Sequence, residues 1–218
     1  MSIQLYFSPG ACSFVPHVML EKAGVPFEPI MVKLHKGEQQ TPEFQTLNPN
    51  GQVPVLVDGG EVLTQILALV GYLDKRFPQA HILPDTPMAR ARAIEMLSWL
   101  NNTVHPTFTH VFMPHKFSDQ PDVQANIREH AVGQYRRLMQ ALQARVVALS
   151  PGQWLAGEHL GPVDAYTLTV TRWATMAGIA PADMPQLWAY VQRVAADAAV
   201  ARVIERERLT VNMHKPSA

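Results

Sequence analysis

The sequence predicts an α/β domain over residues 1–80 and an all-α domain over residues 88–218. In the first part, short strand-like runs alternate with segments of helical periodicity, whereas no convincing strand follows Met88. Pro78, Pro84 and Pro87 lie in a stretch with little periodicity between the two parts. We therefore interpret residues 81–87 as a linker between two domains.

The elements expected in the first domain follow the order β-α-β and then β-β-α. Strands are expected at residues 3–7, 27–33, 53–57 and 62–63, with a hairpin turn at Asp58-Gly59. One helix, over residues 13–23, should stop at Gly24, and a second should begin at Thr41-Pro42-Glu43. A third helix is expected to be capped by Thr64. This order of elements is that of a thioredoxin-like domain.

The second domain is expected to consist of helices packed through apolar faces. A helix that includes Leu97, Leu100 and Val104 meets Pro106, which should kink or end it. A long apolar stripe on the next helix is interpreted as core packing, as amphipathic helices usually bury such a face. This stripe consists of Val123, Ile127, Ala131, Tyr135, Leu138, Leu142, Val146 and Leu149. Further helices are expected to begin near Pro162, Pro185 and Asp197.

Composition limits the classes of function. The chain has 218 residues, 47% of them hydrophobic, so a sizeable core can form and disorder is not expected. Lys+Arg and Asp+Glu both number 18, which argues against a nucleic-acid partner and against a basic membrane-binding patch. No apolar run approaches the roughly 18–20 residues of a spanning helix. No basic-then-apolar N-terminal segment is visible, so a cytoplasmic location is expected.

Pro54 stands where the sequence otherwise indicates the start of a strand. A proline removes a hydrogen-bond donor from the sheet, so it belongs at the first residue of a strand or in a tight turn. Gly51 permits a close approach of the backbone there. Two conformations remain open from the residues alone. One is an ordinary trans proline at a strand edge. The other is a cis Val53-Pro54 bond, a rarer form at about 5–6% of X–Pro bonds, which would turn the Val53 backbone toward a ligand.

Several motifs of the first domain, taken in order, resemble the thioredoxin-like half of a glutathione transferase. They are Ser8-Pro9-Gly10-Ala11-Cys12-Ser13, Pro16-His17, Asn50-Gly51-Gln52-Val53-Pro54-Val55-Leu56, Asp58-Gly59-Gly60 and Leu63-Thr64-Gln65-Ile66-Leu67-Ala68-Leu69. With the proline-rich linker and the helical second half, the resemblance covers the whole chain, and its Gly-Ala-Cys-Ser start is similar to the bacterial beta class. The resemblance implies the glutathione transferase fold, a cis Val53-Pro54 bond and a homodimer.

Cys12 is the only cysteine and lies between an expected strand and the start of a helix. Free backbone N–H groups and the helix dipole favour a thiolate there, although a buried hydrophobic role is equally compatible with the residues alone. Val15 occupies the second position of a Cys-x-x-Cys pair, so an internal dithiol cycle is excluded. The resemblance implies that Cys12 contacts the sulfur of glutathione. Ser13 is expected to cap the helix, or, from the resemblance, to place a hydroxyl near that sulfur.

His105 is the strongest candidate in the helical domain. The stretch Trp99-Leu100-Asn101-Asn102-Thr103-Val104-His105 resembles the beta-class helix that brings a histidine over the sulfur. A histidine can accept a proton or donate a hydrogen bond near neutral pH. His110 and His115 follow at intervals of five residues, which places the three rings on different helix faces, and no carboxylates accompany them. No metal site is therefore expected.

The remaining candidate residues concern binding. A loop that enters a helix presents N–H groups to an anion, and Gln65 with Ile66 stands at such a place. The resemblance implies that this pair holds the γ-glutamyl end of glutathione. Ile66 departs from the small or hydroxylated residue of the family, so its branched side chain is expected to crowd the site. Lys36 is the candidate for the glycyl carboxylate, although a solvated loop charge is equally compatible. The resemblance further implies contacts from Gln52, Val53 and Pro54.

The function implied by the resemblance is conjugation of the glutathione thiolate to a small hydrophobic electrophile. The candidate walls of the electrophile pocket, each more readily explained as core, are Phe108, Phe112, Met113, Trp173 and Met176. Asp164 is interpreted as a structural helix cap. Two alternatives remain: glutathione-dependent thiol–disulfide exchange through Cys12, and a non-catalytic binding protein with the same fold.

Overall fold

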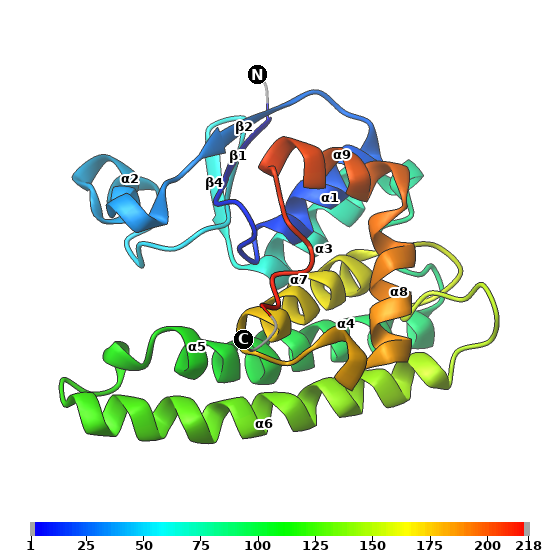
Figure 1. Ribbon diagram of the computed structural model, residues 1–218. Coiled ribbons are helices and arrows are strands. Elements are labelled where there is room, and N and C mark those ends of the chain that lie inside the picture. The colour runs from blue at the N-terminus through cyan, green and yellow to red at the C-terminus, as the bar shows by residue number, and fades with distance from the viewer. Residues whose placement is uncertain (1–2, 216–218) are drawn as a thin grey trace.

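The computed structural model describes residues 3–215, in which a four-stranded sheet with its helices packs on a larger group of helices (Figure 1). The sheet order is β2-β1-β3-β4. The strands are β1 Ile3–Phe7, β2 Phe27–Met31, β3 Val55–Asp58 and β4 Glu61–Thr64. The helices are α1 Phe14–Ala23, α2 Pro42–Leu47, α3 Ile66–Arg76, α4 Pro87–Trp99, α5 His105–Phe112, α6 Pro121–Val147, α7 Pro162–Met176, α8 Pro185–Ala195 and α9 Ala198–Glu207.

The two faces of the sheet bury different cores. In Figure 1, α1 and α3 lie on the side that faces the helical layer, and α2 lies on the opposite side. The large core joins the first face to the helices of the second half, whereas α2 covers a small separate cluster that contains Phe44, Val53 and Val55. The α/β half followed by the all-α half, predicted from the sequence, is therefore confirmed.

Local signals set most helix ends in the α/β half. Gly24 ends α1 in the left-handed conformation with φ of 65°, and the Thr41 side chain accepts a hydrogen bond from the Phe44 N–H at the start of α2. The prediction that Thr64 caps the third helix is wrong. Thr64 is the last residue of β4, where it pairs with Val55, and Gln65 takes the N-cap position. The cross-strand hydrogen bonds extend the hairpin one residue beyond the expected turn into the helix.

Pro106 does not end its helix. Residues Leu100–Val104 form a π-helical segment between α4 and α5, and the His105 N–H bonds to the Leu100 carbonyl. Pro106 therefore occupies the first turn of α5, where a missing N–H costs little. Widened turns of this kind are common at functional sites, because they change the direction in which the following side chains project.

The apolar stripe of α6 is only partly core. Its second half is buried at Ala131, Tyr135 and Leu142, together with Met139, which the sequence-based prediction did not include. The first half packs against α5 but is less buried, since Val123 is 40% exposed. Figure 1 shows this half of α6 running beneath α5.

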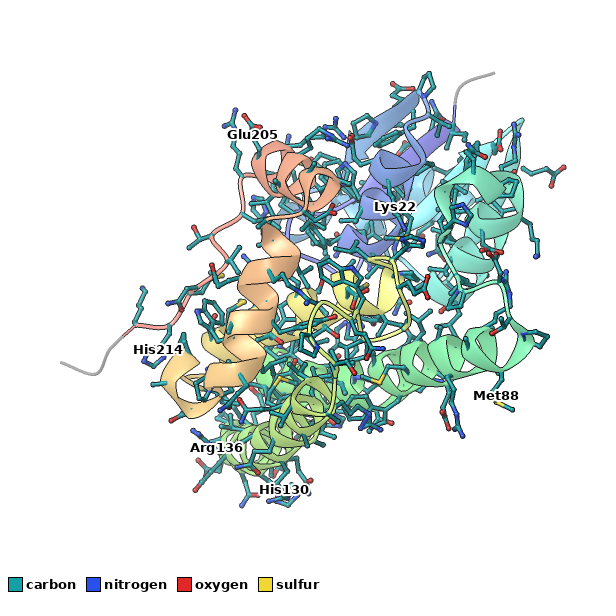
Figure 2. All side chains as sticks on the ribbon, turned by 90° about the vertical axis from the view of Figure 1, so that its right-hand side faces the viewer. Lys22, Met88, His130, Arg136, Glu205 and His214 are labelled. Atoms are coloured by element: carbon teal, nitrogen blue, oxygen red, sulfur yellow. The ribbon has the colours of Figure 1, made fainter. Side chains whose placement is uncertain are left out.

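The junction between the two layers is continuous. Helix α1 packs against α7 and α9, and Ile82 and Leu83 of the predicted linker are buried in the large core. Lys22 of α1, labelled in Figure 2, donates hydrogen bonds to the backbone carbonyls of His81 and Leu160. Burial lowers the pKa of this ammonium group from its ordinary value. Among residues 3–215, no helix combines the length and the apolar character that crossing a bilayer would require.

Candidate functional site

The sheet brings several predicted segments to one edge. Strand β2 runs parallel to β1, and β3 is antiparallel to β1 and to β4. Because Tyr6 pairs with Val55 and Val55 pairs with Thr64, three positions meet at this edge. They are the loop after β1, the residues before β3 and the residues after β4. Cys12, Val53-Pro54 and Gln65-Ile66 are thus placed in neighbouring segments by strand register alone.

The bond between Val53 and Pro54 is cis, the conformation that the resemblance implied. Both residues are buried. The carbonyl oxygen of Val53 accepts a hydrogen bond from Cys12 Sγ over 3.7 Å. The contact joins the loop after β1 to the segment before β3.

Cys12 is a neutral thiol in this environment. Burial raises the pKa of the Cys12 thiol to about 12, although the backbone N–H groups of Cys12 and Ser13 act in the opposite direction. Of the two roles that the residues left open, this environment favours the shielded thiol, because loss of hydration outweighs the two N–H groups. Those donors remain directed at the sulfur position.

Ser13 occupies the N-cap position of α1, but its side chain does not cap the helix. The hydroxyl is fully buried and pairs with the backbone of Ser8, accepting from its N–H over 3.1 Å and donating to its carbonyl over 3.2 Å. This pairing joins the two ends of the loop after β1 and engages the Ser13 hydroxyl within the loop.

Gly10, in the same loop, is held by side chains from the helical half. Its N–H donates to Glu207 over 2.8 Å, and its carbonyl accepts from the Trp173 indole N–H over 2.9 Å. Glu207 is buried and also pairs with His17 of α1 over 2.7 Å. A side chain at position 10 would collide with Arg172, whose guanidinium lies 2.6 Å from the place of a Cβ. The position of the Cys12 loop is thus fixed from the second half of the chain.

His105 lies half-buried against Trp173, with ring centroids 4.7 Å apart. Its Nδ1 atom is 2.8 Å from the Tyr166 hydroxyl. Burial lowers the pKa of His105 to about 4, so the ring is neutral at physiological pH, whereas the sequence suggested titration near neutrality. Burial, followed by the neighbouring Cys12 side chain, raises the pKa of Tyr166 well above its usual range. Trp173, which contacts His105 and donates to the Gly10 carbonyl, joins this pair to the Cys12 loop.

Aromatic rings continue from His105 along α5. Phe108 stacks on Trp173 at 4.9 Å and on Phe112 at 5.7 Å, with interplanar angles of 13° and 11°. Phe108 and Trp173 are buried, whereas Phe112 is 56% exposed. The row of stacked rings therefore runs from the Cys12 loop to solvent, which suits an apolar aromatic ligand.

Gln65 and Ile66 differ sharply in their surroundings. Gln65 is exposed and has a φ of 72°, a strained conformation for a residue other than glycine. Ile66 is only 3% exposed and belongs to the large core, so the expected crowding of the site by its side chain is wrong. Its N–H stands at the first turn of α3, whose start has unpaired N–H groups suited to a carboxylate.

Two predicted binding residues are loosely held. Lys36 is exposed in a short 3₁₀ turn after β2, and no ion pair to it occurs within residues 3–215. Gln52 is exposed, and its carbonyl accepts from the Asn48 side chain over 2.7 Å.

Asp164 is fully buried and accepts from the N–H groups of Gly161 and Leu155, which fits its predicted structural role. No group of three His, Cys, Asp or Glu side chains suited to a metal ion occurs in the described part of the chain.

Sequence reasoning missed the residues that hold the Cys12 loop and His105 in place through hydrogen bonds and packing. Tyr166, Asn101, Arg172 and Glu207 were not predicted to contribute, because each lies on a helix where ordinary periodicity explains it. The one available signal was Asn101, within the stretch quoted for His105. Contacts between residues far apart in the sequence join Glu207 to Gly10 and Tyr166 to His105.

Comparisons with known proteins cover most of the chain. Residues 1–75 match the family model described as glutathione S-transferase, N-terminal domain, and residues 100–198 match the corresponding C-terminal domain. Glutathione S-transferase GST-4.5 of Xanthomonas campestris pv. campestris is 32% identical over 209 residues, covering 95% of this chain and 100% of that protein.

Solved structures show the same similarity. A glutathione transferase homologue from Sulfitobacter, with bound glutathione, has a TM-score of 0.87 and 25% identity, covering 95% of this chain and 99% of that one. A beta-class glutathione S-transferase of Sphingomonas chungbukensis has a TM-score of 0.81 and 30% identity, covering 95% and 100% of the two chains.

Proposed function

Because the chain belongs to the glutathione S-transferase family, we propose that it conjugates the thiolate of glutathione to a small hydrophobic electrophile. The observation that supports this proposal most strongly is the contact between Cys12 and the Val53 carbonyl at one end of the sheet. There the thiol, the Val53-Pro54 segment and the start of α3 lie in neighbouring segments. Relatives of closely similar fold that contain glutathione support the choice of thiol.

Each part of glutathione has a counterpart along this edge. The backbone of Val53, beside Pro54 and Gln52, would pair with the cysteinyl unit. The side chain of Gln65 and the N–H of Ile66 would hold the γ-glutamyl carboxylate at the start of α3. Lys36 would approach the glycyl carboxylate from the turn after β2. In this arrangement the Ile66 side chain stays in the core and leaves the site free.

The sulfur would then lie beside Cys12 and Ser13 with His105 above it. The backbone N–H groups of Cys12 and Ser13, which bond the Cys12 thiol, would donate to a glutathione thiolate brought beside them, and such donors are the electrostatic part of catalysis. The rings of Phe108, Phe112 and Trp173 form the wall on which an apolar electrophile packs. Met113 and Met176 remain further candidates for this wall.

Thiol–disulfide exchange through Cys12 is less well supported. The thiolate is the reactive form in such exchange, and burial raises the pKa of Cys12 to about 12. A binding protein without turnover differs from the proposed enzyme in activity alone, so the experiment below decides between them.

The test measures binding and turnover separately. Calorimetry with glutathione should show binding at millimolar concentration or tighter, and 1-chloro-2,4-dinitrobenzene should be conjugated. Gln65→Ala should weaken binding by about tenfold, the loss of one hydrogen bond to a charged group. The exposed Gln192→Ala on α8 is the matched control and should change neither quantity. Binding without conjugation of any electrophile would support the non-catalytic alternative, and no binding would refute the proposal.

We further propose that the chain forms a cytoplasmic homodimer. Exposed apolar side chains lie on α4, where Met88 is 69% and Ile94 is 42% exposed, and at the start of α6 with Val123. Met88 projects outward in Figure 2. Light scattering should give twice the chain mass of 24.2 kDa, and Ile94→Asp should shift the protein toward the monomer. A monomeric parent protein would refute this proposal, and cell fractionation tests the location.

A further inference from the structure

Within residues 3–215, one ring nitrogen of His105 has a hydrogen-bond partner and the other has none. Nδ1 lies 2.8 Å from the Tyr166 hydroxyl, and Nε2 has no hydrogen-bond partner among residues 3–215. Stacking on Trp173, whose indole N–H is bonded to Gly10, keeps the ring beside the Cys12 loop. What Nε2 can do for a ligand therefore depends on whether the proton of the neutral ring sits on Nδ1 or on Nε2.

The neighbours of Tyr166 decide where that proton sits. The Tyr166 hydroxyl donates to Asn101 Oδ1 over 3.2 Å. The Asn101 amide nitrogen donates to Asn102 Oδ1 over 2.9 Å, which orients the amide with its oxygen toward Tyr166. A hydroxyl has one proton to donate, so toward His105 the Tyr166 oxygen is an acceptor. The Nδ1 atom must therefore carry the ring proton, and Nε2 is left with an open lone pair.

We propose that Tyr166 and Asn101 are positioning residues that hold neutral His105 as the Nδ1–H tautomer, so that Nε2 accepts the thiol proton of bound glutathione. This inference rests on the proposed function, because glutathione supplies the thiol. The arrangement is a nucleophile, a base and a third group that orients the base.

The proton step is balanced within the site. The S–H bond of glutathione breaks, its electron pair stays on sulfur, and a new N–H bond forms at Nε2. The Nδ1–H group of the resulting imidazolium keeps its hydrogen bond to Tyr166. The negative charge of the thiolate beside the ring compensates the loss of hydration that lowers the pKa of His105. After attack on the electrophile, the imidazolium releases its proton to the leaving group or to water. In the opposite tautomer, Nε2–H would instead donate to a thiolate that had already formed.

The tautomer can be read directly in the ligand-free protein. Nitrogen-15 NMR of labelled histidine distinguishes a protonated from an unprotonated ring nitrogen, and His105→Asn assigns the signals. We expect the parent protein to show Nδ1–H and bare Nε2 at pH 7. Asn101→Leu removes the acceptor of Tyr166, so the hydroxyl should turn to donate to Nδ1 and force the proton to Nε2. Asn101→Asp retains an acceptor oxygen and should restore the parent tautomer.

Turnover should follow the tautomer. In Asn101→Leu, kcat for conjugation should fall at least tenfold, within the range that general base catalysis contributes. Its KM for glutathione should stay within about twofold, because no proposed binding contact is touched. Asn101→Asp should recover most of kcat. The matched control is Tyr135→Phe, which removes another fully buried hydroxyl, bonded to the Val170 carbonyl, without touching His105. It should leave both the tautomer and kcat unchanged.

Two results would overturn the inference. One is a parent protein with Nε2–H at His105. The other is an Asn101→Leu variant that changes tautomer and yet keeps or raises kcat, which would make His105 a donor to the thiolate. The tautomer is measured without glutathione, so it tests the positioning contacts separately from the function. Failure of the parent protein to conjugate any electrophile would count against the proposed function alone.

Discussion

Acid should destabilise this protein through His105 in a measurable way. Burial lowers the pKa of the ring from 6.5 to about 4. In the unfolded chain the ring is hydrated, so between these two values the unfolded state binds more protons than the folded state. Stability therefore rises with pH across this window and falls as the pH drops from 6.5 toward 4.

The size of the effect follows from the two pKa values. Linkage gives a loss of about 2 kcal/mol in the free energy of unfolding between pH 7 and pH 4.5 from this ring alone. Carboxylates and other histidines also titrate in this range, so the absolute loss of stability is not diagnostic. His105→Asn removes the titrating ring and leaves an amide that can still donate to Tyr166.

Urea unfolding at pH 7 and pH 4.5, at one fixed protein concentration, measures both proteins. The parent should lose about 2 kcal/mol more than His105→Asn, because all other groups titrate alike in the two. Equal losses would refute the reasoning, as would a proton NMR titration in which His105 changes charge near pH 6.5 in the folded protein.

Other predictions test the buried groups around the same edge. Ile66→Ala should lower the free energy of unfolding by about 2–4 kcal/mol, as expected for a core isoleucine, while calorimetry shows the glutathione Kd changed by less than about threefold. Glu207→Ala should cost about 1–3 kcal/mol in urea unfolding, since it leaves the Gly10 N–H and the buried His17 ring without their hydrogen-bond partner, whereas the exposed Glu205→Ala on the same helix should cost under about 0.5 kcal/mol. Iodoacetamide should alkylate Cys12 at pH 8 at least about a hundredfold more slowly in the folded protein than in urea, because little thiolate is present; equal rates would mean that the thiol is not shielded.

Several features of the protein follow from sequence alone. Strand and helix order, the turn at Gly24, the helix starts at Thr41-Pro42 and Asp197, and the structural role of Asp164 depend on local hydrogen bonds and backbone preferences. Such preferences act over a few residues and can be recognised in one chain. The motifs around Cys12 and Val53-Pro54 were visible for the same reason, since each is a continuous segment.

The tertiary structure decided the chemistry of those motifs. Whether Cys12 is ionised depends on burial, which the second half of the chain supplies by covering the loop after β1. The direction of the Ile66 side chain depends on the register of the β3–β4 hairpin. Because Thr64 still pairs with Val55, α3 begins after Gln65, and the Ile66 side chain lies in the core. The tautomer of His105 depends on Tyr166, which lies 61 residues further along the chain. Local sequence determines which groups are present, but desolvation and hydrogen bonds between distant segments determine their protonation, and these exist only when the two halves are packed together.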